Sequence, residues 1–232
     1  MAVEIVKATP QAPSKFLIIG EPFSGKTTLA SKAPAPLFIS TDGNAAKAGL
    51  DAVNVKTVAD ITEAIQLGLK KPEYKTIVLD TIEGIVDIMT KEIIADANKM
   101  GLRGNGGEPV KALTDIAYGK LTGLLNAKVQ NFAEALATLK KNVIILSYSK
   151  RQLDEMSGAM VLASELKNIR LITRFMDAQV LTHYDGEKYR ANIISKREIM
   201  AGEVDLGEIE TFLAAIGWTL PKKKTKLGTA KR

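Results

Sequence analysis

A short stretch near the start of the chain has the residue types that bind the phosphates of a nucleotide. The motif Gly20-x-x-x-x-Gly25-Lys26-Thr27 lies between an apolar run at 16–19 and a segment at 27–32 that can open a helix. A strand, a loop and a helix in this order form a cradle of backbone N–H groups that holds an anion. Lys26 is expected to reach the β- and γ-phosphates, and the Thr27 hydroxyl to coordinate Mg²⁺. The residues predicted to contact the nucleotide are Gly20, Glu21, Pro22, Phe23, Ser24, Gly25, Lys26, Thr27 and Thr28.

A second candidate follows about 55 residues later. The apolar run at 76–79 ends in Asp80 and Thr81. A carboxylate at the end of such a strand can hold Mg²⁺ through water, beside the hydroxyl of Thr27. The simpler alternative is an aspartate that only forms a turn. Together, Lys26 and Asp80 predict catalysis on a nucleoside triphosphate with Mg²⁺.

Strands and helices that could position these residues alternate along the chain. Asp-Gly between two alternating runs is typical of a hairpin, and a capping box at 60–63 favours a helix start. We expect strands at 16–19, 37–40, 76–81 and 142–149, a hairpin of 178–184 with 189–195, irregular loops at 101–109 and 150–163, and helices at 27–32, 61–70, 83–99, 111–140 (divided at Gly119 or Gly123), 164–175 and 207–216. Such strands favour an α/β fold with a mostly parallel sheet flanked by helices.

Composition narrows the class of protein. The 232 residues include no cysteine, which excludes disulfides, cysteine nucleophiles and cysteine-ligated metals. No apolar run approaches the length of a membrane span, so we expect no membrane partner and a cytoplasmic location. The single histidine, His183, lies on a predicted hairpin strand and is expected to be structural.

The net charge of +6 comes from the end of the chain. Residues 221–232 contain six basic residues and no acidic one, and the rest carries 26 of each sign. The high isoelectric point therefore gives no evidence of a basic face on the folded part. The tail itself can be a solvated terminus or an electrostatic arm for nucleic acid. We expect an extended arm at 1–14, an ATPase domain at 15–217 and a basic disordered tail at 218–232.

The order of these parts resembles the RecA core. In this resemblance Asp42 takes the place of the catalytic glutamate that activates water, although its side chain is one methylene shorter. Tyr148 takes the place of the glutamine that senses the γ-phosphate. Lys196 and Arg197 lie where RecA-type proteins carry residues that reach the ATP of a neighbouring subunit. For either basic residue the alternative is a solvated strand end.

The same resemblance implies where DNA would bind. The stretches 96–110 and 150–163 fall where RecA has its two DNA-binding loops. The candidates for contacts with DNA phosphates are Arg103, Lys111, Lys150 and Arg151. Because aromatic residues are scarce near both loops, backbone contacts rather than base stacking are expected to dominate.

A closer resemblance is to the compact phage RecA-like proteins of the single-strand annealing (shortened-RecA) class. It covers about residues 15–215 and includes the P-loop opening, the second strand PLF-x-x-x-DG, Asp80-Thr81, Tyr118-Gly119 and the hairpin. It implies an ATPase stimulated by single-stranded DNA that acts in phage-type recombination and promotes annealing, in the host cytoplasm if phage-encoded. The implied partners are single-stranded DNA, further copies of the chain in a filament or ring, and a single-strand DNA-binding protein.

Two other functions remain open. A P-loop kinase of a small substrate would need an arginine-rich lid, whereas the last third of this chain is predicted to form a hairpin. A nucleotide-gated loading or structural partner with slow hydrolysis fits the short side chain at Asp42. An AAA+ helicase loader with a helical lid is not expected, because only about 16 residues follow the last predicted helix.

Overall fold

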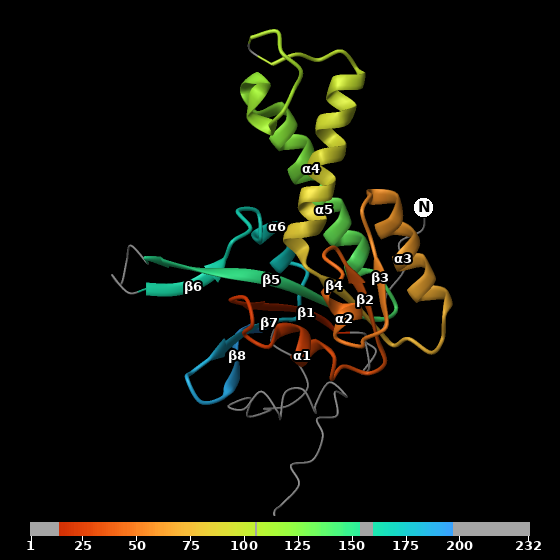
Figure 1. Cartoon of the computed structure of the whole chain (residues 1–232), viewed down its shortest axis with the longest axis vertical. Helices are drawn as coiled ribbons and strands as arrows, with labels where there is room; N and C mark the ends of the chain where they lie inside the picture. Colours follow the sequence, from red (N-terminus) through yellow and green to blue (C-terminus); the bar gives the residue numbers. More distant parts are fainter. Residues whose placement is uncertain (1–13, 105, 154–159, 197–232) are drawn as a thin grey trace, which may run out of the picture.

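The computed structural model describes residues 14–104, 106–153 and 160–196. Its strands form one sheet in the order β3-β2-β4-β5-β1-β7-β8, with β6 paired to β5 beside this path (Figure 1). The strands are β1 Lys15–Gly20, β2 Pro36–Ser40, β3 Ala52–Asn54, β4 Thr76–Asp80, β5 Asn142–Leu153, β6 Met160–Ser164, β7 Ala178–Tyr184 and β8 Tyr189–Lys196. The helices are α1 Lys26–Ala30, α2 Asn44–Lys47, α3 Val58–Lys70, α4 Ile82–Lys99, η1 Leu113–Asp115, η2 Ala117–Gly119, α5 Lys120–Ala137 and α6 Arg170–Thr173.

The central strands run parallel because their residues are apolar and need cover on both faces. Every residue of β1 and β4 is buried. Neighbours from β3 to β7 are parallel, whereas β8 runs antiparallel to β7 and β6 runs antiparallel to β5. The P-loop strand β1 thus lies between β5 and β7, and the strand that ends in Asp80 is on the far side of β5.

Two cores hold the helices against the sheet. On one face, Phe38, Val78 and Ile144 pack with alanines of α1 and α2. On the other face, Leu79 and Ile145 pack with the apolar sides of α3, α4, α5 and α6. This packing fixes the carboxyl ends of the parallel strands, which is where ligands bind in open α/β sheets.

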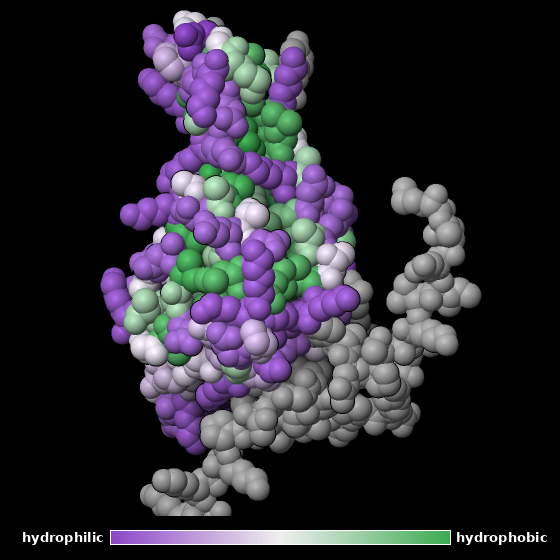
Figure 2. Space-filling model, turned by 90° about the vertical axis from the view of Figure 1, so that its right-hand side faces the viewer, coloured by the Kyte–Doolittle hydropathy of each residue, from purple (hydrophilic) through white to green (hydrophobic). Residues whose placement is uncertain are grey.

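Helices α4 and α5 continue beyond the sheet as an arm (Figure 1). In the space-filling view the arm is a narrow column above a broader body (Figure 2). Its tip is firmly built, because the Asn98 side chain donates to the carbonyl of Val110 at 2.8 Å and accepts from its N–H at 2.8 Å. Val110 is buried beneath this clamp.

The fold class expected from the sequence is confirmed: a RecA-like P-loop core with a mostly parallel sheet and a C-terminal hairpin. The hairpin bounds match closely, since β7 and β8 flank the Asp185-Gly186 turn. Gly119 has a positive φ of 63° and directly precedes α5, so it does divide the predicted helix 111–140. The expected arm at 1–13, helix at 207–216 and tail at 218–232 lie outside the described residues.

Some predicted boundaries are wrong. Helix α3 begins at Val58 rather than 61, because Thr57 caps it and Asp60 completes the capping box from the third helical position. Residues 150–153 continue β5 and pair with β6, where a loop had been expected over 150–163. Of the predicted helix 164–175, only Arg170–Thr173 is α-helical. The short strand β3 was not predicted.

Candidate active site

The loop between β1 and α1 has a backbone that few residues can adopt. Gly25 has φ 90° and Phe23 has φ 62°. A Cβ on Gly20 would lie 2.2 Å from the Ser24 hydroxyl oxygen and 2.3 Å from that of Thr182 on β7. These two hydroxyls are hydrogen-bonded to each other at 2.8 Å, so β7 supports the loop from the side. Glycine at position 20 is therefore required by close packing.

Lys26 is folded back onto its own loop. Its Nζ donates to the carbonyl oxygens of Gly20 at 2.9 Å and Glu21 at 2.8 Å. It also lies 4.6 Å from the centre of the Tyr148 ring, within the range of a cation–π contact. Burial lowers the pKa of Lys26, and the negative charges of Asp80 and Glu83 oppose that shift. An arriving phosphate would offer this ammonium stronger acceptors than two neutral carbonyls.

Thr27 and Asp80 meet at the expected metal position. The Thr27 hydroxyl donates to Asp80 Oδ2 at 3.2 Å. Burial raises the pKa of Asp80 to about 6, helped by the nearby charge of Asp42 and opposed by the Thr27 hydrogen bond. No cluster of three or more metal-ligating side chains occurs within the described ranges. A hydroxyl and one carboxylate nevertheless fit Mg²⁺, which keeps several waters and takes its other ligands from phosphates.

Asp42 lies at the mouth of the same site, but its carboxylate is already engaged. Oδ1 accepts from the Ser40 hydroxyl at 3.1 Å and from the Asn44 N–H at 2.9 Å, and Oδ2 accepts from the Asn44 side chain at 2.6 Å. These contacts build the turn between β2 and α2. Because a carboxylate has about four lone-pair positions, Asp42 can still accept a further hydrogen bond.

A cleft of about 780 Å³ joins these groups. This volume is within the usual range for small-molecule sites. Ten of the residues predicted from the sequence line it: Pro22, Phe23, Ser24, Gly25, Lys26, Thr27, Thr28, Asp42, Asp80 and Tyr148. Gly20 and Glu21 lie beneath the lining and contribute the carbonyl oxygens that hold Lys26.

The hairpin contributes residues that the sequence did not point to. Tyr189 and Arg190 of β8 line the cleft together with residues of α1. A Cβ on Gly25 would lie 3.3 Å from the Tyr189 ring, so the hairpin packs directly on the P-loop. Only tertiary packing reveals this contact, because the two segments are far apart in sequence.

Glu83 is a further residue that sequence reasoning missed. It lies in the first turn of α4, and its Oε1 accepts from the Ser147 hydroxyl at 2.6 Å and from the Tyr148 N–H at 3.0 Å. Its Oε2 is buried and makes no hydrogen bond among the described residues. Burial raises the pKa of Glu83, and the hydrogen bond from Ser147 opposes that shift. The only signal in the sequence was an acidic residue three positions after Asp80.

The predicted DNA contacts lie on two separate projections. Arg103 and Lys111 are exposed at the tip of the arm, and Arg103 forms an isolated bridge with Pro109. Lys150 and Arg151 belong to β5 where it leaves the body beside β6, away from the arm (Figure 1). The structure does not bring these two pairs together.

The predicted trans-acting residues lie at the end of the hairpin. Lys196 is the last residue of β8 and pairs with Ala178, and Arg197 lies outside the described residues. No helix within the described part of the chain is long and apolar enough to cross a membrane.

Comparison with known proteins gives one family and a distant structural likeness. A family model described as an AAA domain (AAA_24) matches residues 12–202. No curated protein matches. Among solved structures, the ATPase domain of another protein is similar at 13% sequence identity and a TM-score of 0.47, covering 82% of this chain and 79% of that one.

Proposed function

Because the chain belongs to the AAA domain family, and is a RecA-like P-loop ATPase, we propose that it hydrolyses ATP with Mg²⁺. One observation carries the proposal: Lys26, Thr27 and Asp80 converge on a cleft large enough for a nucleotide. The proposal does not extend to a helicase loader. The described part of the chain ends in a hairpin packed on the P-loop, where a loader would carry a helical lid.

The residues of the site have distinct tasks in this proposal. Loop N–H groups and Lys26 hold the phosphates, which requires Lys26 to leave the carbonyls of Gly20 and Glu21. Thr27 and Asp80 hold Mg²⁺, which neutralises charge on the phosphates when bound. Asp42 orients the attacking water. Catalysis is then mainly positioning and electrostatic stabilisation.

A second candidate is a nucleotide-gated partner that hydrolyses slowly. The observation in its favour is that both carboxylate oxygens of Asp42 are already hydrogen-bonded within their own turn. With a weakly oriented water, ATP would bind normally but react slowly. Comparable ATP affinity with very slow turnover would favour this candidate over an active ATPase.

The finer part of the proposal is a role in phage-type DNA recombination, with binding of single-stranded DNA and annealing. The exposed Arg103 and Lys111 on the arm tip and Lys150 on β5 support it, and they would act through phosphate neutralisation. Copies of the chain would assemble into a filament or ring, with Lys196 or Arg197 completing a neighbour's site. A single-strand DNA-binding protein would be a further partner. The ATPase domain would span 15–217, between an arm at 1–14 and a tail at 218–232.

Steady-state hydrolysis with and without single-stranded DNA tests the activity. Asp80→Asn keeps the side-chain size but removes the charge offered to Mg²⁺, so turnover should fall by about 100-fold. Asp87→Asn is the matched control, because Asp87 is exposed on α4 and pairs with Lys91. Transfer of phosphate to a nucleoside or metabolite instead of water would support a kinase and contradict the proposal.

Salt dependence tests the DNA role. If Arg103 and Lys111 neutralise phosphates, replacing both with alanine should weaken DNA binding and flatten its dependence on salt concentration. A chain ending at Leu220 separates the tail from these residues. An unchanged slope in the double variant would remove the arm tip from the DNA contacts, and an unchanged slope in the shortened chain would remove the tail.

A further inference from the structure

Glu83 compensates for an early strand end. The ladder between β4 and β5 finishes at the pair Leu79–Ile145, and β5 continues past it to Tyr148. The Tyr148 N–H lies beyond the last residue of β4 that pairs with β5. A buried N–H without a partner is costly. The Glu83 carboxylate, from the helix that follows β4, accepts this hydrogen bond instead at 3.0 Å.

The same oxygen also fixes the neighbouring residue. Glu83 Oε1 accepts from the Ser147 hydroxyl at 2.6 Å, and that hydroxyl lies 2.9 Å from the Ser164 hydroxyl on β6. One carboxylate atom therefore ties the start of α4 to two consecutive residues of β5 and, through Ser147, to β6. Hydrogen bonds to an ionised acceptor are about twice as strong as neutral ones.

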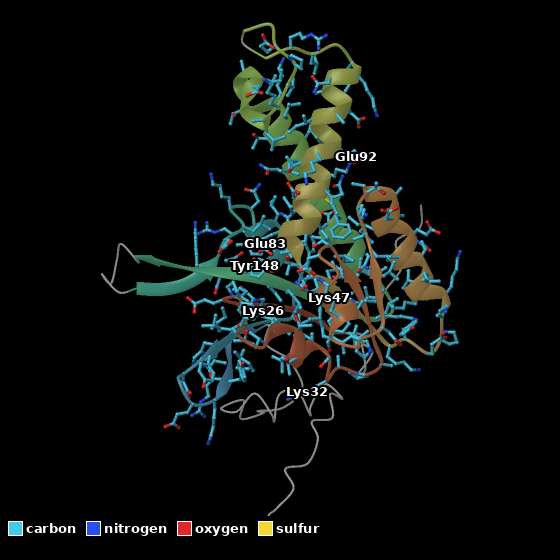
Figure 3. The ribbon with its side chains drawn as sticks, viewed as in Figure 1. Lys26, Lys32, Lys47, Glu83, Glu92 and Tyr148 are labelled. Carbon is cyan, nitrogen blue, oxygen red and sulfur yellow. The ribbon has the colours of Figure 1, made fainter. Side chains whose placement is uncertain are left out.

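Tyr148 is the residue through which this anchor reaches the cleft. Its ring lines the cleft and lies 4.6 Å from the Lys26 ammonium. Glu83 itself is absent from the cleft lining, so its carboxylate lies behind the tyrosine. In Figure 3 the labelled Glu83, Tyr148 and Lys26 follow one another from the base of α4 through β5 to the P-loop.

We infer that Glu83 is a positioning residue of the ATP site, which fixes the end of β5 and thereby holds the Tyr148 ring beside Lys26. This role rests on the proposed ATPase activity. Glu83 contributes no atom to the reaction. It contributes a hydrogen-bond acceptor that keeps two residues of β5 in place, and the ring then limits where the lysine ammonium can lie when phosphates enter.

Two substitutions separate an acceptor from a charge. Glu83→Gln keeps an oxygen that can accept from Ser147 and the Tyr148 N–H, so its kcat should stay within about threefold of the parent protein. Glu83→Ala removes the acceptor, and kcat should fall about tenfold while KM for ATP changes little. If Glu83→Gln is as slow as Glu83→Ala, the carboxylate acts through its charge or a proton, and the positioning role is wrong.

A double-mutant cycle tests the route through the ring. If Glu83 acts through Tyr148, Glu83→Ala should have little further effect on kcat in a Tyr148→Ala background. Independent, multiplying effects would overturn the inference. The amide resonance of Tyr148 should also shift in Glu83→Ala, whereas an unchanged resonance would mean that the hydrogen bond is not made in solution.

Controls distinguish a local effect from loss of folding. Glu92→Ala removes a carboxylate from the same helix, where Glu92 pairs with Lys128 of α5, and should leave kcat unchanged. Should Glu83→Ala not fold, Ser147→Ala removes one of the two hydrogen bonds and should lower kcat less but in the same direction; unchanged kcat there would count against the inference. A parent protein that does not hydrolyse ATP would contradict the proposed function. Hydrolysis that Glu83→Ala leaves intact would contradict only the role of Glu83.

Discussion

Two buried lysines, Lys15 and Lys26, lie near opposite ends of the P-loop strand. Their exposed fractions are 4% and 6%. Each ammonium donates to two backbone carbonyl oxygens: Lys15 to Leu139 at 2.8 Å and Lys141 at 2.6 Å, and Lys26 to two carbonyls of its own loop. Burial lowers the pKa of both. By hydrogen bonding and burial alone the two would be assigned the same role.

Their surroundings differ in ways that separate function from structure. Lys26 borders the cleft and is influenced by Asp80 and Glu83, so its carbonyl contacts can be exchanged for phosphate. Lys15 does not line that cleft, and the charge that acts on it is that of Asp177. Its carbonyl partners follow the C-terminal end of α5, where a cation is favourable. A buried lysine therefore indicates a ligand site only when acidic groups and open volume accompany it.

The largest expected effect separates the two lysines by activity. Lys26→Ala should lower kcat/KM for ATP by about 100-fold or more, because it removes a charge directed at the phosphates. Its free energy of unfolding should change little, since burying that charge is itself unfavourable. Steady-state hydrolysis and urea unfolding measure both quantities, with Lys47→Ala on α2 as an exposed control. Normal hydrolysis by Lys26→Ala would remove the functional half of the comparison.

The reverse pattern is expected at the other lysine. Lys15→Ala should lower the free energy of unfolding by roughly 2 to 3 kcal/mol, because two carbonyls lose a donor and the buried stem is removed. Its kcat for ATP should be unchanged. Urea unfolding against Lys140→Ala, an exposed lysine in the same connection, provides the comparison. A Lys15 variant as stable as that control would show that its hydrogen bonds are not stabilising.

The sequence predicts the parts of the site that local patterns encode. The P-loop, Asp80 and the hairpin were each visible because a motif or alternation lies within a few consecutive residues. Glu83 was not visible, because its partners Ser147 and Tyr148 are about 65 positions away and meet it only after β4 and β5 pair. No local pattern indicates where one strand of a pair ends before the other.

The wrong boundaries have a related cause. Asp60 suits either the cap or the third helical position, and the Thr57 hydroxyl at 3.1 Å from its N–H decides for the latter. Residues 150–153 resemble a loop because they lack an apolar run. They extend β5 because β6 supplies an antiparallel partner. In both places a contact outside the pattern chose between two locally acceptable conformations.

The pH dependence of stability sharpens the comparison further. Burial lowers the pKa of Lys15 to about 8 from the usual 10.5, so between these values the unfolded chain binds more protons than the folded one. Stability attributable to Lys15 should therefore rise with pH from about 8 to 10.5, by on the order of 1 kcal/mol per pH unit at most. Lys15→Met keeps the stem but cannot titrate, and the difference between the two proteins isolates this group. A difference that is flat across this window would mean that Lys15 has an ordinary pKa.

The smallest expected effect concerns the aromatic neighbour of Lys26. Tyr148→Phe keeps the ring face within reach of the ammonium, so kcat should change by less than about twofold. Tyr148→Leu keeps much of the volume but removes the ring, and kcat should fall by about tenfold. Because both variants leave the backbone N–H to Glu83, a difference between them isolates the ring. If Tyr148→Phe were as slow as Tyr148→Leu, the hydroxyl would be the active part, and Lys26 would owe its position to the charges of Asp80 and Glu83 rather than to the ring.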